Sequence, residues 1–112
     1  MEHLPAIDLE LGAKLAGNNP KAARELLAML METLATDFQE IQTLHQQGDL
    51  FAMSEKVHRL HGATCYCGVP ALRYAIANLD AHLKEGKASG LNQLFSQFSL
   101  EIKRVLAEYE PA

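Results

Sequence analysis

Four side chains that can act as nucleophiles, ligands or proton carriers recur along one stretch of the chain. They are spaced three or four residues apart: Ser54, His58, His61 and Cys65. In an α-helix, that spacing places side chains on one face, which we expect to be turned toward water. An exposed imidazole held on a rigid helix can accept a transferable phosphoryl group as a nucleophile, and His58 is the candidate for this role.

Gly62 lies four residues after His58, in the interior of the same predicted helix. An interior glycine costs a helix about 1 kcal/mol relative to alanine, so some benefit should offset it. One possible benefit is a hollow beside the His58 ring, through which a phosphoryl-bearing loop of a partner approaches. The other is close packing of a neighbouring helix. The spacing alone does not choose between steric access and packing.

The elements that position these residues are expected to be helices. Ala, Leu, Glu, Gln, Lys and Met dominate the composition, whereas Val, Ile and Thr are sparse, which favours an all-α fold. Four breaks rich in Gly, Asn and Pro divide the chain. They predict helices over residues 8–16, 20–47, 50–67, 70–85 and 90–108.

Each of the four long segments carries one apolar stripe. In the third segment the stripe includes Met53, Val57 and Leu60, one residue away from the stripe of His58. Four amphipathic helices with short connections bury such stripes most simply as an up-down-up-down antiparallel four-helix bundle. The short N-terminal helix is the additional element of this architecture.

The ends of the helices and the outer faces carry further expectations. Asp49 should cap the third helix, and Gly68 should supply the left-handed residue after it. In the first segment Leu9, Leu11 and Leu15 are expected to close one end of the bundle. The charged run 101–104 is expected to form a solvent-exposed face of the last helix.

Length, charge and cysteine spacing exclude several classes of protein. A chain of 112 residues has room for one domain, so residues 1–112 are expected to form a single unit. The net charge of −4 argues against a nucleic-acid partner. No apolar stretch approaches the roughly 20 residues of a membrane span, and no secretory signal opens the sequence, so a cytoplasmic setting is expected. Cys65 and Cys67 are too close for an ordinary disulfide and are expected to be reduced thiols.

The stretch from position 58 to 70 matches a known motif. Its sequence is HRLHGATCYCGVP. It resembles the histidine phosphotransfer (HPt) motif, in which a phosphorylatable His is followed by x-Leu-Lys-Gly and, several residues later, by another Gly. It is especially similar to the C-terminal HPt domain of hybrid sensor histidine kinases of the GacS/BarA type. The likeness is strong over the third helix and its exit turn, and elsewhere it extends to the order and length of the helices.

The resemblance implies a role in a two-component phosphorelay. His58 would accept a phosphoryl group from an aspartate on the receiver domain of a hybrid kinase and pass it to the aspartate of a response regulator. Such transfers depend mainly on positioning and charge stabilisation. The receiver domain would bring Mg²⁺ and the acidic pocket, with no cofactor in this chain. The chain would be a monomeric phosphocarrier without kinase activity of its own, as a domain of an inner-membrane sensor kinase.

The sequence departs from the family pattern at one position beside the site. His61 stands where the family usually has Lys, and histidine, unlike lysine, is largely neutral at pH 7. We expect His61 to hydrogen-bond the phosphoryl group or, when protonated, to pair with it. Many family members brace the active His with a Gln on the fourth helix. The aligned position holds Asp80, with Lys84 one turn later, and the alignment assigns a role to neither.

The partner is expected to dock around His58. The candidate contacts are small, apolar, thiol or cationic side chains near its stripe: Ala52, Arg59, Ala63, Cys65 and Val69.

Two other classes of function remain open. His58, His61 and Cys65 are all zinc ligands, although a fourth ligand such as His45 or His82 would be needed and the spacing matches no usual zinc motif. A helical adaptor without chemistry is the second alternative, with the histidines as polar surface and the cysteines as packing residues. No glycine-rich nucleotide loop is visible, so we expect no ATP binding or hydrolysis.

Overall fold

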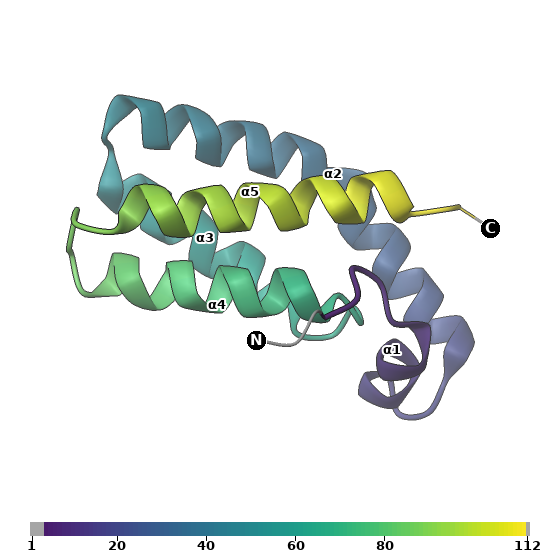
Figure 1. Ribbon diagram of the computed structural model, residues 1–112. Helices are drawn as coiled ribbons and strands as arrows, with labels where there is room; N and C mark the ends of the chain where they lie inside the picture. Colours follow the sequence, from purple (N-terminus) through teal and green to yellow (C-terminus); the bar gives the residue numbers. More distant parts are fainter. Residues whose placement is uncertain (1–3, 112) are drawn as a thin grey trace.

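The computed structural model describes residues 4–111, which form five α-helices and no strand (Figure 1). The all-helical class predicted from the composition is confirmed. The helices are α1 (Leu9–Leu15), α2 (Pro20–Gln47), α3 (Leu50–Thr64), α4 (Pro70–Lys84) and α5 (Leu91–Glu108).

Local hydrogen bonds explain where the long helices α2 and α3 begin. The side chain of Asn19 accepts from the backbone N–H of Ala22, and a proline occupies the first turn of α2. Gly48 adopts φ +72° at the end of α2, a conformation that costs glycine least. The Asp49 side chain then accepts from the N–H of Ala52 at 3.2 Å, which caps α3 as predicted.

The four long helices pack around one hydrophobic core. α2 contacts α3 and α5, α4 contacts the same two helices, and α1 contacts α2. In Figure 1, α2 continues past the ends of the other long helices to reach α1. The apolar stripes supply the core, whose members without exposed surface include Leu34, Ile41, Met53, Val57, Leu72, Ile76, Leu79, Phe98, Ile102 and Val105.

α3 ends at Thr64, three residues earlier than the predicted end at Cys67. The Thr64 hydroxyl donates to the carbonyl of His61 at 2.7 Å, and the Cys65 thiol donates to the same carbonyl at 3.4 Å. The N–H of Cys65 bonds to the carbonyl of Gly62 instead, three residues back. This tighter bonding ends the α-helix, and Cys67 is buried in the turn that follows rather than on the helix.

We call the contact between this turn and α1 the Gly68 junction; it comprises Asp8, Gly12 and Gly68. The N–H of Asp8 donates to the carbonyl of Gly68 at 2.8 Å. Gly68 has φ +56°, and a Cβ atom built there would lie 2.5 Å from the carbonyl oxygen of Asp8 and 2.8 Å from Gly12 Cα. The left-handed residue predicted at Gly68 is therefore confirmed, and its neighbours leave no room for a side chain.

Two expectations are wrong in part. Of the three leucines expected to close one end of the bundle, Leu9 is 59% exposed, whereas Leu11 and Leu15 are half-buried and line a pocket together with Gly68 and Val69. Glu101 is buried, with its Oε1 2.7 Å from Nη1 of Arg104. Arg104 also donates to the backbone carbonyl of Leu4 at 3.2 Å, so this part of α5 lies under the N-terminal segment instead of facing water.

No helix within residues 4–111 is both long enough and apolar enough to cross a membrane.

Candidate functional site

His58 projects from the middle of α3, and its side chain is 63% exposed. Its Nδ1 atom lies 3.1 Å from Oδ2 of Asp80, on α4. The ring is therefore held at one nitrogen while most of its surface remains open to a partner. This combination fits a nucleophile that must meet another protein.

Asp80 is the centre of the site, although its side chain is only 3% exposed. Its Oδ2 atom is shared by His58 and His61, whose Nδ1 lies 2.9 Å away, and by the Lys84 ammonium at 3.5 Å. The second oxygen, Oδ1, is buried without a hydrogen-bond partner among the described residues. Two histidines of α3 and one lysine of α4 thus converge on one carboxylate oxygen.

The contacts assign the protons on both rings. An ionised carboxylate only accepts hydrogen bonds, so Nδ1 of His58 and Nδ1 of His61 must both donate. In a neutral imidazole, the other nitrogen then carries the lone pair. The exposed His58 ring therefore presents Nε2 as its nucleophilic atom.

The electrostatic setting keeps Asp80 ionised. Burial opposes its charge and by itself raises its pKa. Hydrogen bonds from His61 and His58, together with the charges of Lys84 and His58, outweigh burial and hold the pKa of Asp80 below its ordinary value. At neutral pH the residue is an acceptor with a full negative charge.

Gly62 faces open space. The residue is exposed, and a Cβ atom built there would meet nothing within 4 Å. No helix among residues 4–111 packs against it, so the packing explanation for this glycine is wrong. The bare backbone patch predicted on the His58 side of α3 is present.

The other members of the predicted water-facing stripe are not fully exposed. The His61 side chain retains 26% exposure, and Ser54 and Cys65 are half-buried. The cause lies in α4, which packs along this flank of α3 and brings Asp80 against His61. Among the histidines of the stripe, His58 is thus the one that stands clear of the protein.

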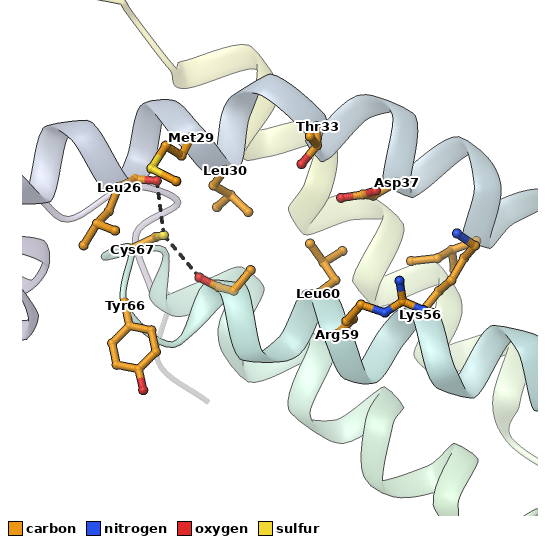
Figure 2. Close-up of a pocket in the computed structure, with 12 residues that line it drawn as sticks. Leu26, Met29, Leu30, Thr33, Asp37, Lys56, Arg59, Leu60, Tyr66 and Cys67 are labelled. Atoms are coloured by element: carbon orange, nitrogen blue, oxygen red, sulfur yellow. Dashed lines mark hydrogen bonds between the residues drawn. The ribbon is translucent and has the colours of Figure 1, made fainter.

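On the α2 side of α3, next to the site, lies an open and largely apolar groove (Figure 2). Figure 2 shows the residues of α2, of α3 and of the turn after α3 that line it; Met29 and Tyr66 stand at the rim and are 63% and 60% exposed. Arg59 and Ala63, two of the predicted docking residues, line the same groove. The buried Cys67 thiol closes one end by donating to backbone carbonyls of both helices.

The remaining docking candidates differ in exposure. Ala52 is half-buried. Val69 is 1% exposed and belongs to the core, so its prediction as a surface contact is wrong. Val69 directly precedes α4, where the tight turn at the Gly68 junction directs its side chain inward.

Asp80 is the member of this cluster to which the sequence assigned no role. Two signals pointed to it: it aligns with the glutamine that braces the active histidine in the HPt family, and it follows Leu79 of the buried stripe. Neither signal reveals the rotation of α4, which decides whether a residue beside the stripe faces α3 or water.

Within residues 4–111, no group of three or more His, Cys, Asp or Glu side chains is arranged to hold a metal ion. His45, one of the possible fourth zinc ligands, stacks on Phe95 at a ring separation of 4.1 Å and contacts Asn92. The zinc alternative thus gains no support from these contacts.

Comparisons with known proteins agree on one family. A family model described as "Hpt domain" matches residues 25–108. The sensor histidine kinase GacS of Pseudomonas protegens is 38% identical over 105 residues, and the sensor protein GacS of Pseudomonas syringae pv. syringae is 42% identical over 79 residues. These alignments cover 94% and 70% of this chain but 11% and 9% of the two relatives. The chain thus spans about a tenth of the length of these curated relatives.

The fold has a solved counterpart. The crystal structure of the HPT domain from a hybrid histidine kinase of Shewanella superposes with a TM-score of 0.86 and 29% sequence identity. The superposition covers 91% of this chain and 88% of that chain.

Proposed function

The chain belongs to the Hpt domain family, and from that premise we propose that His58 is the residue that carries the phosphoryl group. Hpt domains are phosphocarriers of phosphorelays rather than enzymes, and this chain has that histidine phosphotransfer role. The observation that supports His58 is its geometry: an exposed ring, held through Nδ1 by a buried carboxylate, with Nε2 free.

The transfer follows from the free Nε2 atom. Its lone pair attacks the phosphorus of an aspartyl phosphate on a receiver domain, and the bond from phosphorus to the aspartate oxygen breaks as the N–P bond forms. The aspartate leaves as a carboxylate. Discharge runs the same step in reverse, with the aspartate of a response regulator as the attacking group. In this scheme the receiver domain, not this chain, supplies Mg²⁺ and the acidic pocket.

His61 has a narrower role than the family's lysine. Its Nδ1 donates to Asp80, so a neutral His61 presents only a lone pair at Nε2 and cannot donate to a phosphoryl oxygen. The doubly protonated ring can donate. We propose that His61 stabilises the phosphoryl group in its imidazolium form.

The groove between α2 and α3 is our candidate for the receiver docking surface. It adjoins His58 along α3, and it combines an apolar floor with the cation of Arg59 and the exposed rim of Met29 and Tyr66. Exposed apolar side chains gathered at one place mark interaction sites. Gly62, on the His58 side of the helix, gives steric access for the receiver's phosphorylated loop, and half-buried Cys65 continues that surface.

The packing of the helices bears on the topology, the domain organisation and the oligomeric state of the protein. We propose that α2 to α5 form an up-down-up-down antiparallel four-helix bundle, because each long helix contacts two others and the connections are short. Contacts of the N-terminal segment with Gly68 and Ala71 support residues 1–112 as one domain. Because His58, His61 and Asp80 come from one chain, the domain needs no second copy, and we propose a monomer.

The partners follow from the relatives' architecture. We propose that the chain works in the cytoplasm as the C-terminal phosphotransfer domain of an inner-membrane hybrid sensor kinase, because the similar proteins are much longer sensor kinases. It would take the phosphoryl group from a receiver domain of that kinase and pass it to a response regulator. We propose no nucleic-acid partner and no membrane contact for this domain.

The decisive experiment is to offer a phosphorylated receiver domain to the wild-type chain and to His58→Gln. The wild type should acquire a label that is lost in acid and kept in base, as a phosphohistidine is. His58→Gln should remain unlabelled while keeping its helical circular dichroism spectrum. A variant that is labelled as strongly as the wild type would overturn the assignment, and metal analysis of the same preparations tests the zinc alternative.

The docking surface has its own test. Ala63→Arg places a long cation in the groove without touching the His58–Asp80 contact. We expect slower transfer from the receiver and an unchanged rate of labelling by phosphoramidate, a donor too small to need the groove. Equal receiver rates in variant and wild type would mean that the groove is not the docking surface.

A further inference from the structure

The contact between His58 and Asp80 bears on the second half of the relay, in which the phosphoryl group leaves. When the His58 ring is phosphorylated at Nε2, its Nδ1 atom can keep or lose its proton. If Nδ1 keeps the proton, the phosphorylated ring is a cation. Asp80 follows His58 by 22 residues in the sequence, but its Oδ2 atom lies directly against the Nδ1 proton of His58. The distance from Nδ1 to Oδ2 is 3.1 Å.

We infer that Asp80 is a positioning residue that keeps the Nδ1 proton on His58 through both loading and discharge, so that neither step requires a proton to leave or return. The inference rests on the proposed role of His58 and deepens it. It assigns to Asp80 a function in making phosphohistidine a good phosphoryl donor, beyond orienting the free ring.

The balance of bonds and charges shows why the proton matters. On loading, the Nε2 lone pair forms the N–P bond, the donor carboxylate departs, and the ring becomes positive. On discharge, the electron pair of the N–P bond returns to Nε2 while the acceptor carboxylate binds phosphorus. The leaving group is a neutral imidazole if Nδ1 is protonated, but a far more basic imidazolate if that proton has been lost.

Without a carboxylate at this position, the phosphorylated ring would release its Nδ1 proton to solvent as the pH rises. A proton would then have to return before each discharge. An adjacent negative charge favours the protonated, cationic ring. The Asp80 side chain is only 3% exposed, so water screens its charge mainly from the side of the exposed His58 ring.

The surrounding charges are consistent with this role. His61 of α3 and Lys84 of α4 both face Oδ2 and help to keep Asp80 ionised, in agreement with its lowered pKa. From α2, Glu40 pairs with Lys56 on the other flank of α3. From α5, Glu101 pairs with Arg104, and the described residues of that helix make no ion pair with Asp80.

Asp80→Asn is the matched variant, because it preserves the shape and an oxygen acceptor while removing the charge. Both proteins are loaded with phosphoramidate and then discharged to the same receiver domain between about pH 6 and about pH 9. We expect the ratio of wild-type to variant discharge rates to grow with pH, approaching tenfold per pH unit once the variant's ring has lost its proton. Nitrogen NMR of the loaded proteins should show Nδ1 of His58 protonated to a higher pH in the wild type.

A rate ratio that stays constant with pH, or identical protonation of the two loaded rings, would overturn the role of Asp80. Failure of the wild type to load at His58, measured against His58→Gln, would instead overturn the proposed function. The use of one receiver for both proteins cancels its own pH dependence, and chemical loading keeps the measurement possible if the variant accepts poorly from a receiver.

Discussion

Gly62 and Gly68 lie six residues apart in the same motif, yet they occupy opposite environments. Around Gly62 the surface is bare, and an added Cβ would touch nothing within 4 Å. At the Gly68 junction, an added Cβ would come within 3 Å of backbone atoms of Asp8 and Gly12. The comparison teaches that one motif combines a glycine on an open surface with a glycine enclosed by the fold.

Substitution of glycine by alanine should therefore have different effects in the two regions. At the Gly68 junction we expect a loss of folding free energy with intact chemistry in the molecules that fold. At Gly62, beside His58, we expect the reverse: slower phosphoryl transfer with no loss of stability.

The largest effect is expected at the Gly68 junction. Gly68→Ala should lower the free energy of unfolding by about 2–5 kcal/mol, because it combines a left-handed backbone with an overlap against Asp8 and Gly12. Urea denaturation measures the change.

Gly48→Ala is the matched control for that prediction. Gly48 has φ +72° but an open environment, so alanine there should cost only the backbone preference of about 1–2 kcal/mol. Equal losses in the two variants would show that the contacts of the Gly68 junction contribute nothing.

An intermediate and opposite effect is expected at the His58 face. Gly62→Ala should raise the free energy of unfolding by about 1 kcal/mol, since alanine favours the helix interior and meets no neighbour. It should also slow transfer from a receiver several-fold, because the methyl group narrows the approach to His58. Labelling by the small donor phosphoramidate should be unchanged.

Three measurements on Gly62→Ala separate these effects: unfolding, receiver transfer and chemical labelling. If stability rises and transfer from the receiver stays at the wild-type rate, Gly62 gives no access to a partner. Gly62 and Gly68 would then differ in their effect on stability but not in a role in transfer.

The smallest effect is expected at His61. His61→Ala should slow transfer by about threefold at pH 6, which corresponds to the lower part of the ~0.5–1.5 kcal/mol that one hydrogen bond contributes. The donation requires the imidazolium form of His61, because Nδ1 is engaged by Asp80. Transfer rates of variant and wild type that coincide from pH 6 to pH 8 would remove this role.

The pH dependence of stability tests the charge of Asp80 separately. Its pKa is lower in the folded protein, so its charge stabilises the fold above the ordinary carboxyl pKa, and this contribution disappears as the pH falls through the folded value. The stability difference between wild type and Asp80→Asn should therefore diminish in acid.

Much of the fold could be predicted because its signals are local. Caps such as Asn19 and Asp49, and the left-handed glycines, act through hydrogen bonds and steric contacts within a few residues. The apolar stripes follow the helical period and therefore identified the core. The predicted end of α3 was wrong because Thr64 and Cys65 bond to a helix carbonyl, a competition that periodicity does not reveal.

The site was predictable only in part. His58, Gly62 and Gly68 stood out through residue type and spacing.

Two buried positions outside the site were not predicted. The burial of Glu101 was missed because its cover comes from Arg104 and from the N-terminal segment, which lies outside its own helix. The inward position of Val69 was missed because the tight turn before α4 sets it.

By itself, the sequence determined the helices, their buried stripes and a histidine on the outer side of α3, because each depends on interactions within about one helical turn. The tertiary structure decided that Asp80 of α4 meets His58 and His61 of α3. Each residue turns a helix by about 100°, so a small change in how α4 packs would direct that carboxylate to water instead. That rotation is set by the packing of the whole core, and no stretch of sequence around either histidine encodes it alone.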